Sequence, residues 1–262
     1  MKKTYLIIVS SIILLFFISS SVYAGFEIDV GTSYSTLNME EFNAFLSVRS
    51  REHEDTIKAT LKNIGFHDIE SKNFSDLDNA FGAMISGRYW FNDLIAVGGA
   101  LEAFLIPTLE YNLFFPETYQ YLRTDVYDER FKLDLYGALA EAKAKILDEE
   151  GRTVKLNLGF GKYYSSLDWG QSYNSEFFDD LEEDYKNDYT YSAESWGAKF
   201  GSQFSYQITD TVNLDSTLNY RLLVIDDYKD DEGKKFFDSY NNQVMEFDFS
   251  GFELISSVSF RF

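Results

Sequence analysis

Period-two alternation of apolar and polar residues constrains this chain more than any other feature of its sequence, because such alternation is typical of a strand with two different faces. The pattern recurs in eight segments: 25–35, 79–91, 94–105, 130–146, 153–164, 191–208, 211–225 and 245–262. Both prolines, Pro107 and Pro116, fall between segments, where a missing backbone donor interrupts no strand pairing. The sequence therefore predicts an all-β fold of eight strands.

The connections between these segments alternate in length along the chain. The short ones are residues 92–93, 147–152 and 209–210, which are rich in turn-forming residues, and the long ones are 36–78, 106–129, 165–190 and 226–244. An antiparallel meander brings all the short turns to one end and all the long connections to the other. Closing such a meander into an up-and-down barrel leaves no unpaired edge, so we predict an eight-stranded antiparallel barrel.

Alternation by itself does not say which face of each strand lies inside. Apolar faces turned inward would make a soluble, lipocalin-like barrel, whereas apolar faces turned outward would make a transmembrane barrel with a polar lumen. The segments are 11 to 18 residues long, which meets or exceeds the length of a spanning strand. Aromatic residues gather at the segment ends, as at membrane interfaces, and the long connections share one side. These features favour the transmembrane barrel.

The first 24 residues are typical of a secretory signal peptide. Lys2 and Lys3 precede an apolar run over residues 6–18, and Val22 and Ala24 occupy small-residue cleavage positions. The run is shorter than the roughly 20 residues that a spanning helix needs. We therefore expect a signal peptide over residues 1–24 and a barrel domain over residues 25–262. The net charge of −20 argues against nucleic acid as a partner, because the negatively charged phosphates would repel the protein.

The last segment keeps its alternation to the final residue. One face carries Phe252, Leu254, Val258, Phe260 and Phe262, and this end resembles the C-terminal insertion signature of bacterial outer-membrane barrels. Together with the signal peptide and the loop pattern, the chain resembles the small eight-stranded OmpA, OmpX and OmpW class. The resemblance implies an outer-membrane location with periplasmic termini, and recognition of this end by the outer-membrane assembly machinery. A last strand paired with the first would leave no backbone group unpaired toward lipid.

Charged residues on the opposite faces of the strands are predicted to point into the lumen. They are Arg88, Glu102, Glu141, Lys143, Lys155, Lys199, Asp215, Arg221 and Glu253. Eight strands leave a bore just wide enough for side chains to fill, so we interpret this set as an ion-pair network that plugs the lumen. An ion or proton path is the alternative. Alternation is weak in segment 130–146, and a slip of one residue would turn Glu141 and Lys143 outward.

The first long connection carries apolar residues at helical spacing. These are Phe42, Phe45, Leu46, Ile57, Leu61 and Ile64, with Asn38 as a candidate N-cap, and they predict one or two short helices over the barrel mouth. Residues 166–190 and 226–238 are acidic but lack EF-hand spacing. We expect solvated loops there, with loose bridging by divalent cations as the alternative.

We predict an outer-membrane barrel embedded in lipid, with a plugged lumen and a structural or surface-interaction role, without a cofactor or a metal site. A narrow channel for small or hydrophobic solutes is one alternative. A lipid-modifying enzyme is another, but the histidines His53 and His67 lie in no motif that defines a base and a nucleophile, so we expect no enzyme.

Overall fold

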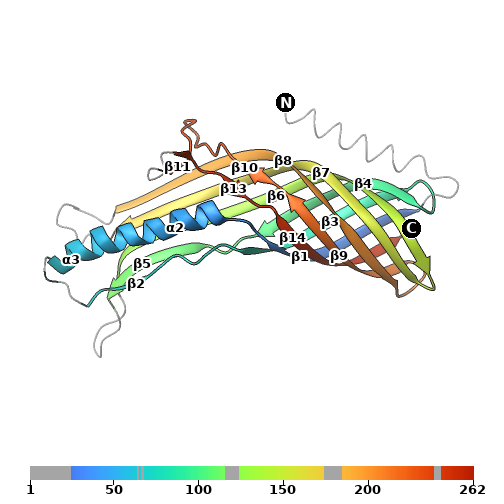
Figure 1. The fold of residues 1–262 in the computed structure, drawn as a ribbon, viewed down its shortest axis with the longest axis horizontal. Helices are drawn as coiled ribbons and strands as arrows, with labels where there is room; N and C mark the ends of the chain where they lie inside the picture. Colours follow the sequence, from blue (N-terminus) through green and yellow to red (C-terminus); the bar gives the residue numbers. More distant parts are fainter. Residues whose placement is uncertain (1–24, 64, 66–67, 116–123, 174–184, 239–242) are drawn as a thin grey trace.

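The computed structural model describes residues 25–63, 65, 68–115, 124–173, 185–238 and 243–262, so the predicted signal peptide lies outside the described residues. Eight antiparallel strands form a closed ring in the order β6-β4-β3-β1-β14-β9-β8-β7, which the pairing of β6 with β7 completes (Figure 1). The strands are β1 (Phe26–Thr36), β3 (Asn79–Trp90), β4 (Ile95–Leu105), β6 (Thr124–Glu149), β7 (Arg152–Tyr173), β8 (Tyr185–Gln207), β9 (Val212–Leu222) and β14 (Gly251–Arg261). The predicted eight-stranded barrel is confirmed.

Closure of the ring accounts for a chain that ends inside a strand pattern. Strand β14 pairs with β1 from Arg261, opposite Glu27, to Glu253, opposite Ser35. Phe26 and Phe262 exchange backbone hydrogen bonds, with N–O distances of 3.1 and 2.8 Å. The last residue therefore completes the ladder, and its backbone groups have partners where lipid would offer none.

The two faces of the ring differ as a transmembrane barrel requires. Leu158 on β7 is 60% exposed and Leu254 on β14 is 50% exposed, whereas Lys155 and Glu253 on the opposite faces of the same strands are 1% exposed. The apolar belt also includes Ile85, Leu101, Leu156, Phe160, Phe200, Leu214, Leu218 and Leu222. The lipocalin-like alternative is therefore wrong, because it requires the reverse arrangement.

Three strands are much longer than the alternation predicted. Strand β6 begins at Thr124, β7 continues to Tyr173 and β8 begins at Tyr185, so much of the expected connections 106–129 and 165–190 is sheet. Strand β5 (Leu109–Phe115) pairs with β6, and β2 (Glu70–Lys72) pairs with β5. We use the term extension for two sets of strands. The first is the parts of β6, β7 and β8 that run past the other ring strands, and the second is β5 with β2.

Strand β6 exchanges the polarity of its two faces where the extension begins. Between residues 136 and 144 its outward face is apolar, and its inward face carries Glu141 and Lys143. Between residues 130 and 135 the outward residues are Arg130, Lys132 and Asp134, and the inward residues are Phe131, Leu133 and Leu135. The weak alternation of segment 130–146 thus reflects an exchange of the two faces, from apolar outside and charged inside to charged outside and apolar inside.

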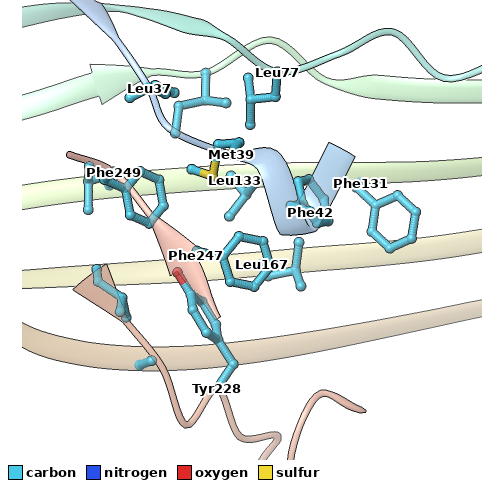
Figure 2. Close-up of a cluster of buried hydrophobic side chains, with 14 of the residues drawn as sticks. Leu37, Met39, Phe42, Leu77, Phe131, Leu133, Leu167, Tyr228, Phe247 and Phe249 are labelled. Carbon is cyan, nitrogen blue, oxygen red and sulfur yellow. The ribbon is translucent and has the colours of Figure 1, made fainter. Parts of the chain in front are cut away.

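Helix α2 (Glu40–His53) supplies the other side of that apolar core. The Phe42 ring contacts the rings of Phe131 on β6 and Phe247 on β13 (Phe247–Asp248), with centroids 5.9 and 4.8 Å apart (Figure 2). A π-helix, η1 (Glu54–Lys58), and α3 (Ala59–Asn63) follow α2, which confirms the predicted helical connection. The predicted N-cap is wrong: Met39 precedes α2, and Asn38 Nδ2 instead donates to Asp248 Oδ2 at 2.7 Å.

The described residues between β9 and β14 fold back as short paired strands, so the alternating segments predicted over 211–225 and 245–262 are each interrupted: β9 ends at Leu222, and β14 begins only at Gly251. Strand β10 (Val224–Ile225) pairs with β13, and β11 (Phe237–Asp238) pairs with β12 (Gln243–Val244). This segment contributes Tyr228, Phe236, Phe247 and Phe249 to the apolar core. In the part of the chain that is described, no helix combines the length and the hydropathy needed to cross a membrane.

Replacing Leu158 by arginine tests the apolar belt. Leu158 faces outward near the middle of the ring, so a charge there is expected to lower the free energy of unfolding in lipid bilayers by about 2 to 4 kcal/mol. Ser166 lies on the same face of β7 but beside Asp134, at the level where β4 ends and the extension begins, so Ser166→Arg is expected to cost less than about 0.5 kcal/mol. Urea titration of the folded protein in liposomes measures both values. Equal costs would contradict the proposed position of the belt.

Candidate functional site

The structure places the nine charged residues that the sequence assigned to the lumen inside the barrel. Eight are buried, and the Glu141 side chain is 9% exposed. Two further interior acids, Glu27 and Asp29 on β1, were missed. Their signal was present in the sequence, since both alternate with the outward residues Ile28 and Val30.

One group of ion pairs lies near the end of the barrel that carries both described chain ends. Arg88 NH1 lies 2.8 Å from Glu27 Oε1, and Arg88 NH2 lies 2.5 Å from Asp29 Oδ2. Lys155 Nζ lies 3.4 Å from Glu27, and Lys143 Nζ lies 3.4 Å from Asp29. Each of the two carboxylates is thus shared by an arginine and a lysine from other strands, which joins β1, β3, β6 and β7 across the bore.

A second group lies nearer the extension. Lys199 contacts Glu102 and Glu141, and its Nζ lies 3.0 Å from Glu141 Oε1. Glu141 Oε2 also lies 3.7 Å from Arg88 NH2, so this carboxylate connects the two groups. Arg221 NH1 lies 3.6 Å from Glu253 Oε1. We call the two groups together the interior charge network.

On the side of this network toward the extension, aromatic and aliphatic side chains fill the bore. The Arg221 guanidinium stacks on the Phe104 ring at 4.3 Å from its centroid, where the charged level meets the apolar one. Figure 2 shows the next level, in which residues from α2, β6 and β7 meet residues of the segment 223–249. Its buried members include Leu37, Met39, Leu77, Leu133, Leu167, Tyr228 and Phe249.

Glu129 on β6 holds the C-terminal end of α2 against the extension. Its Oε1 accepts hydrogen bonds from Arg49 NH2 at 2.9 Å and from Trp169 Nε1 at 2.7 Å, and its Oε2 lies 2.5 Å from His53 Nε2. Gln171 Nε2 adds a further bond at 2.9 Å. We call Glu129 and these four partners the Glu129 cluster.

The charge of Glu129 is stabilised although its side chain has no exposed surface. Burial alone would raise the pKa of Glu129, but the hydrogen bond with His53 and the positive charge of Arg49 outweigh it and lower the pKa to about 2. Burial next to Glu129 raises the pKa of Tyr127, whose hydroxyl lies 3.3 Å from His53 Nε2. At neutral pH the cluster therefore contains a carboxylate that is fully used in structural contacts.

Sequence reasoning did not find the Glu129 cluster, because residues 106–129 were expected to form a loop. His53 was weighed as a catalytic candidate in the first long connection, where no motif gave it a partner, whereas in the structure it lies on α2 and its partner Glu129 is 76 positions away. The one available signal was that Tyr127 and Glu129 continue the inward positions of Phe131 and Leu133. His67 lies outside the described residues.

The remaining predicted features lie on the surface. Phe252, Leu254, Phe260 and Phe262 are exposed on the outer face, and Val258 is half-buried on that face. Part of the acidic stretch 166–190, residues 174–184, lies outside the described residues. In stretch 226–238, Asp227 pairs with Lys229 and Lys235, so its charge is compensated. Within the described ranges no group of three or more histidine, aspartate or glutamate side chains could hold a metal ion.

A closed ring of eight antiparallel strands with an apolar outer belt defines a small β-barrel of the outer-membrane type. Solved structures with a similar fold include Neisserial surface protein A (12% identity, TM-score 0.45, 90% of this chain and 97% of that chain covered). Ail of Yersinia pestis, in complex with the heparin analogue sucrose octasulfate, matches at 14% identity and a TM-score of 0.42, covering 92% and 100%. OprG from Pseudomonas aeruginosa matches at 11% identity and a TM-score of 0.40, with 92% of this chain and 96% of that chain covered. No protein-family model and no curated protein sequence matches the chain.

Proposed function

We propose that this protein is a non-conducting outer-membrane barrel that carries a rigid platform for contacts at the cell surface. The filled bore is the observation that carries the proposal. The interior charge network occupies one level, and the aromatic core between α2 and the extension occupies the next. We expect these two levels together to close the bore to solutes, because an eight-stranded ring is only wide enough for its own side chains.

The platform consists of the extension and α2. Its inner face is an apolar core of its own, and its outer face carries salt-bridged charges such as Arg130 with Asp188 and Lys132 with Asp134. A barrel that only anchors itself in lipid needs neither a second core nor strands of 22 to 26 residues. We infer that this part serves interactions outside the membrane, with the chain termini in the periplasm.

The proposal includes partners that follow from the surface of the barrel. Outer-membrane lipid would cover the apolar belt, and the outer-membrane assembly machinery would recognise the exposed aromatic face of β14. Phe252, Phe260 and Phe262 support this second role by their exposure.

Planar-bilayer recordings test the closed bore. The inserted protein is expected to give no discrete conductance step, because crossing the network would require breaking several buried ion pairs at once. A porin inserted in the same bilayers shows that single openings are detectable. Reproducible steps from this protein would contradict the proposed function and favour an ion path.

A conduit for small apolar solutes is a second candidate function. One observation favours it: the inner lining of the extension is apolar and aromatic, and α2 covers it. Asn43 on α2 donates to Asp78 Oδ1 at 3.2 Å, and the chain has no cysteine, so a variant with Asn43→Cys and Asp78→Cys would allow α2 to be locked by oxidation. Uptake of an apolar dye into liposomes that falls on oxidation would support the conduit. Uptake equal to that of protein-free liposomes in both redox states is what we expect.

A further inference from the structure

The charges enclosed in the bore do not balance. Six acids lie inside, Glu27, Asp29, Glu102, Glu141, Asp215 and Glu253, against five bases, Arg88, Lys143, Lys155, Lys199 and Arg221. Two further bases lie at the rim: Arg261, which is 42% exposed and 3.5 Å from Glu27, and Lys145, which is 12% exposed and pairs with the exposed Asp148 at 2.7 Å. Among the enclosed groups one negative charge is therefore left without a counter-charge.

Asp215 on β9 is the acid that the ion pairs leave out. It is 1% exposed, and neither carboxylate oxygen has a hydrogen-bond partner among the residues that the structure describes. The other five enclosed acids each lie within 4 Å of an arginine or a lysine, and Asp215 lies in none of those pairs. A buried carboxylate without a partner is strongly unfavourable, so its position calls for a positive group that fits beside it.

The two residues paired with Asp215 on the neighbouring strands carry hydroxyl groups. Ser205 on β8 lies directly across from it on one side and Ser257 on β14 on the other, and both are buried. Thr217, two positions further along β9, is on the same face. A carboxylate flanked by hydroxyls offers only oxygen ligands, which hard metal cations prefer.

We propose that Asp215, Ser205 and Ser257 bind one sodium ion inside the half of the bore near the chain termini. A singly charged ion compensates the single unpaired carboxylate, whereas a divalent ion would replace one uncompensated charge by another. The site joins β8, β9 and β14, and it lies apart from the Glu129 cluster and from the extension. It therefore does not depend on the proposed surface role.

Thermal unfolding of the full-length protein, refolded into detergent micelles in sodium chloride or in choline chloride at equal ionic strength, tests the site. Because an ion that binds only the folded state adds stability by mass action, Tm is expected to rise by a few degrees for each tenfold increase in sodium and to stay constant with choline. Broadening of the ²³Na resonance by the folded protein gives an independent readout. These measurements on the unsubstituted protein do not require that any variant folds.

Asp215→Asn is expected to abolish both the sodium-dependent rise in Tm and the line broadening. Asp210→Asn removes an exposed acid from the turn before β9 and is the matched control, which is expected to keep both. Equal Tm values in sodium and choline for the unsubstituted protein would overturn the proposal, because water or a proton would then satisfy Asp215. A sodium response that persists in Asp215→Asn would overturn it as well, since the ion would lie elsewhere.

Discussion

Replacing Glu129 by alanine is expected to lower the free energy of unfolding by about 3 to 5 kcal/mol and to detach the end of α2 from the extension. The substitution leaves Arg49 and His53 without their buried anion and Trp169 Nε1 without its acceptor. Urea titration measures the loss, and hydrogen exchange of the α2 amides locates it.

Glu52 provides a matched control, because it also pairs with Arg49, at 3.2 Å, but is 42% exposed. Glu52→Ala is expected to change the free energy of unfolding by less than about 0.5 kcal/mol. If both substitutions cost the same, or if α2 exchange is unchanged in Glu129→Ala, Glu129 does not hold the helix.

The pH dependence of stability offers a second readout of Glu129. Its pKa of about 2 in the folded protein lies below the ordinary value of 4.5, so the unfolded chain takes up this proton first as the pH falls. The stabilisation is therefore complete above about pH 4.5 and is lost as the pH falls toward 2. The shift corresponds to roughly 3 kcal/mol. In Glu129→Ala, this loss of stability between about pH 4.5 and pH 2 should be absent.

Replacing Lys199 by leucine is expected to have a comparably large effect on the barrel itself. Lys199 contacts both Glu102 and Glu141, and all three side chains are enclosed, so its removal leaves two carboxylates with too few counter-charges. We expect a loss of about 3 to 5 kcal/mol in the free energy of unfolding, measured in lipid or detergent.

Lys162 on the neighbouring strand β7 is the control for Lys199. It pairs with Glu194 at 2.5 Å, but the two side chains are 47% and 62% exposed. Lys162→Leu is expected to cost less than about 1 kcal/mol. Adding Glu102→Leu to Lys199→Leu should recover part of the loss, because an apolar pair replaces an unpaired charge. A double variant that is no more stable than Lys199→Leu would argue against this pairing.

The transmembrane part of the fold was predictable because each of its strands keeps one environment on each face. In β9, Leu214 and Leu218 face outward while Asp215 and Asn219 face inward, so the register follows from the alternation. The pattern failed in β6, where Phe131 and Glu141 share the inward face. A rule that assigns all apolar residues to one side cannot register a strand that passes from lipid into water.

The candidate site divides in the same way. The residues that line the bore could be named from alternation, but their partners could not, because the pairs join strands far apart in the chain, such as Lys155 with Glu27. The Glu129 cluster depends on contacts between α2 and β6 that only packing creates. The lack of a partner for Asp215 could not be predicted either, because the sequence gives the number of charged residues but not their positions in space.

The alternation, the loop lengths and the final aromatic residue predicted an eight-stranded barrel with an apolar exterior and a charged interior. Few other arrangements satisfy every backbone hydrogen bond of a strand that faces lipid. Only the tertiary structure decided that three strands continue beyond the other strands of the ring, that their inner face becomes an apolar core, and that α2 packs against it. Such packing depends on which surfaces meet in space, and the local periodicity of the sequence does not determine these contacts.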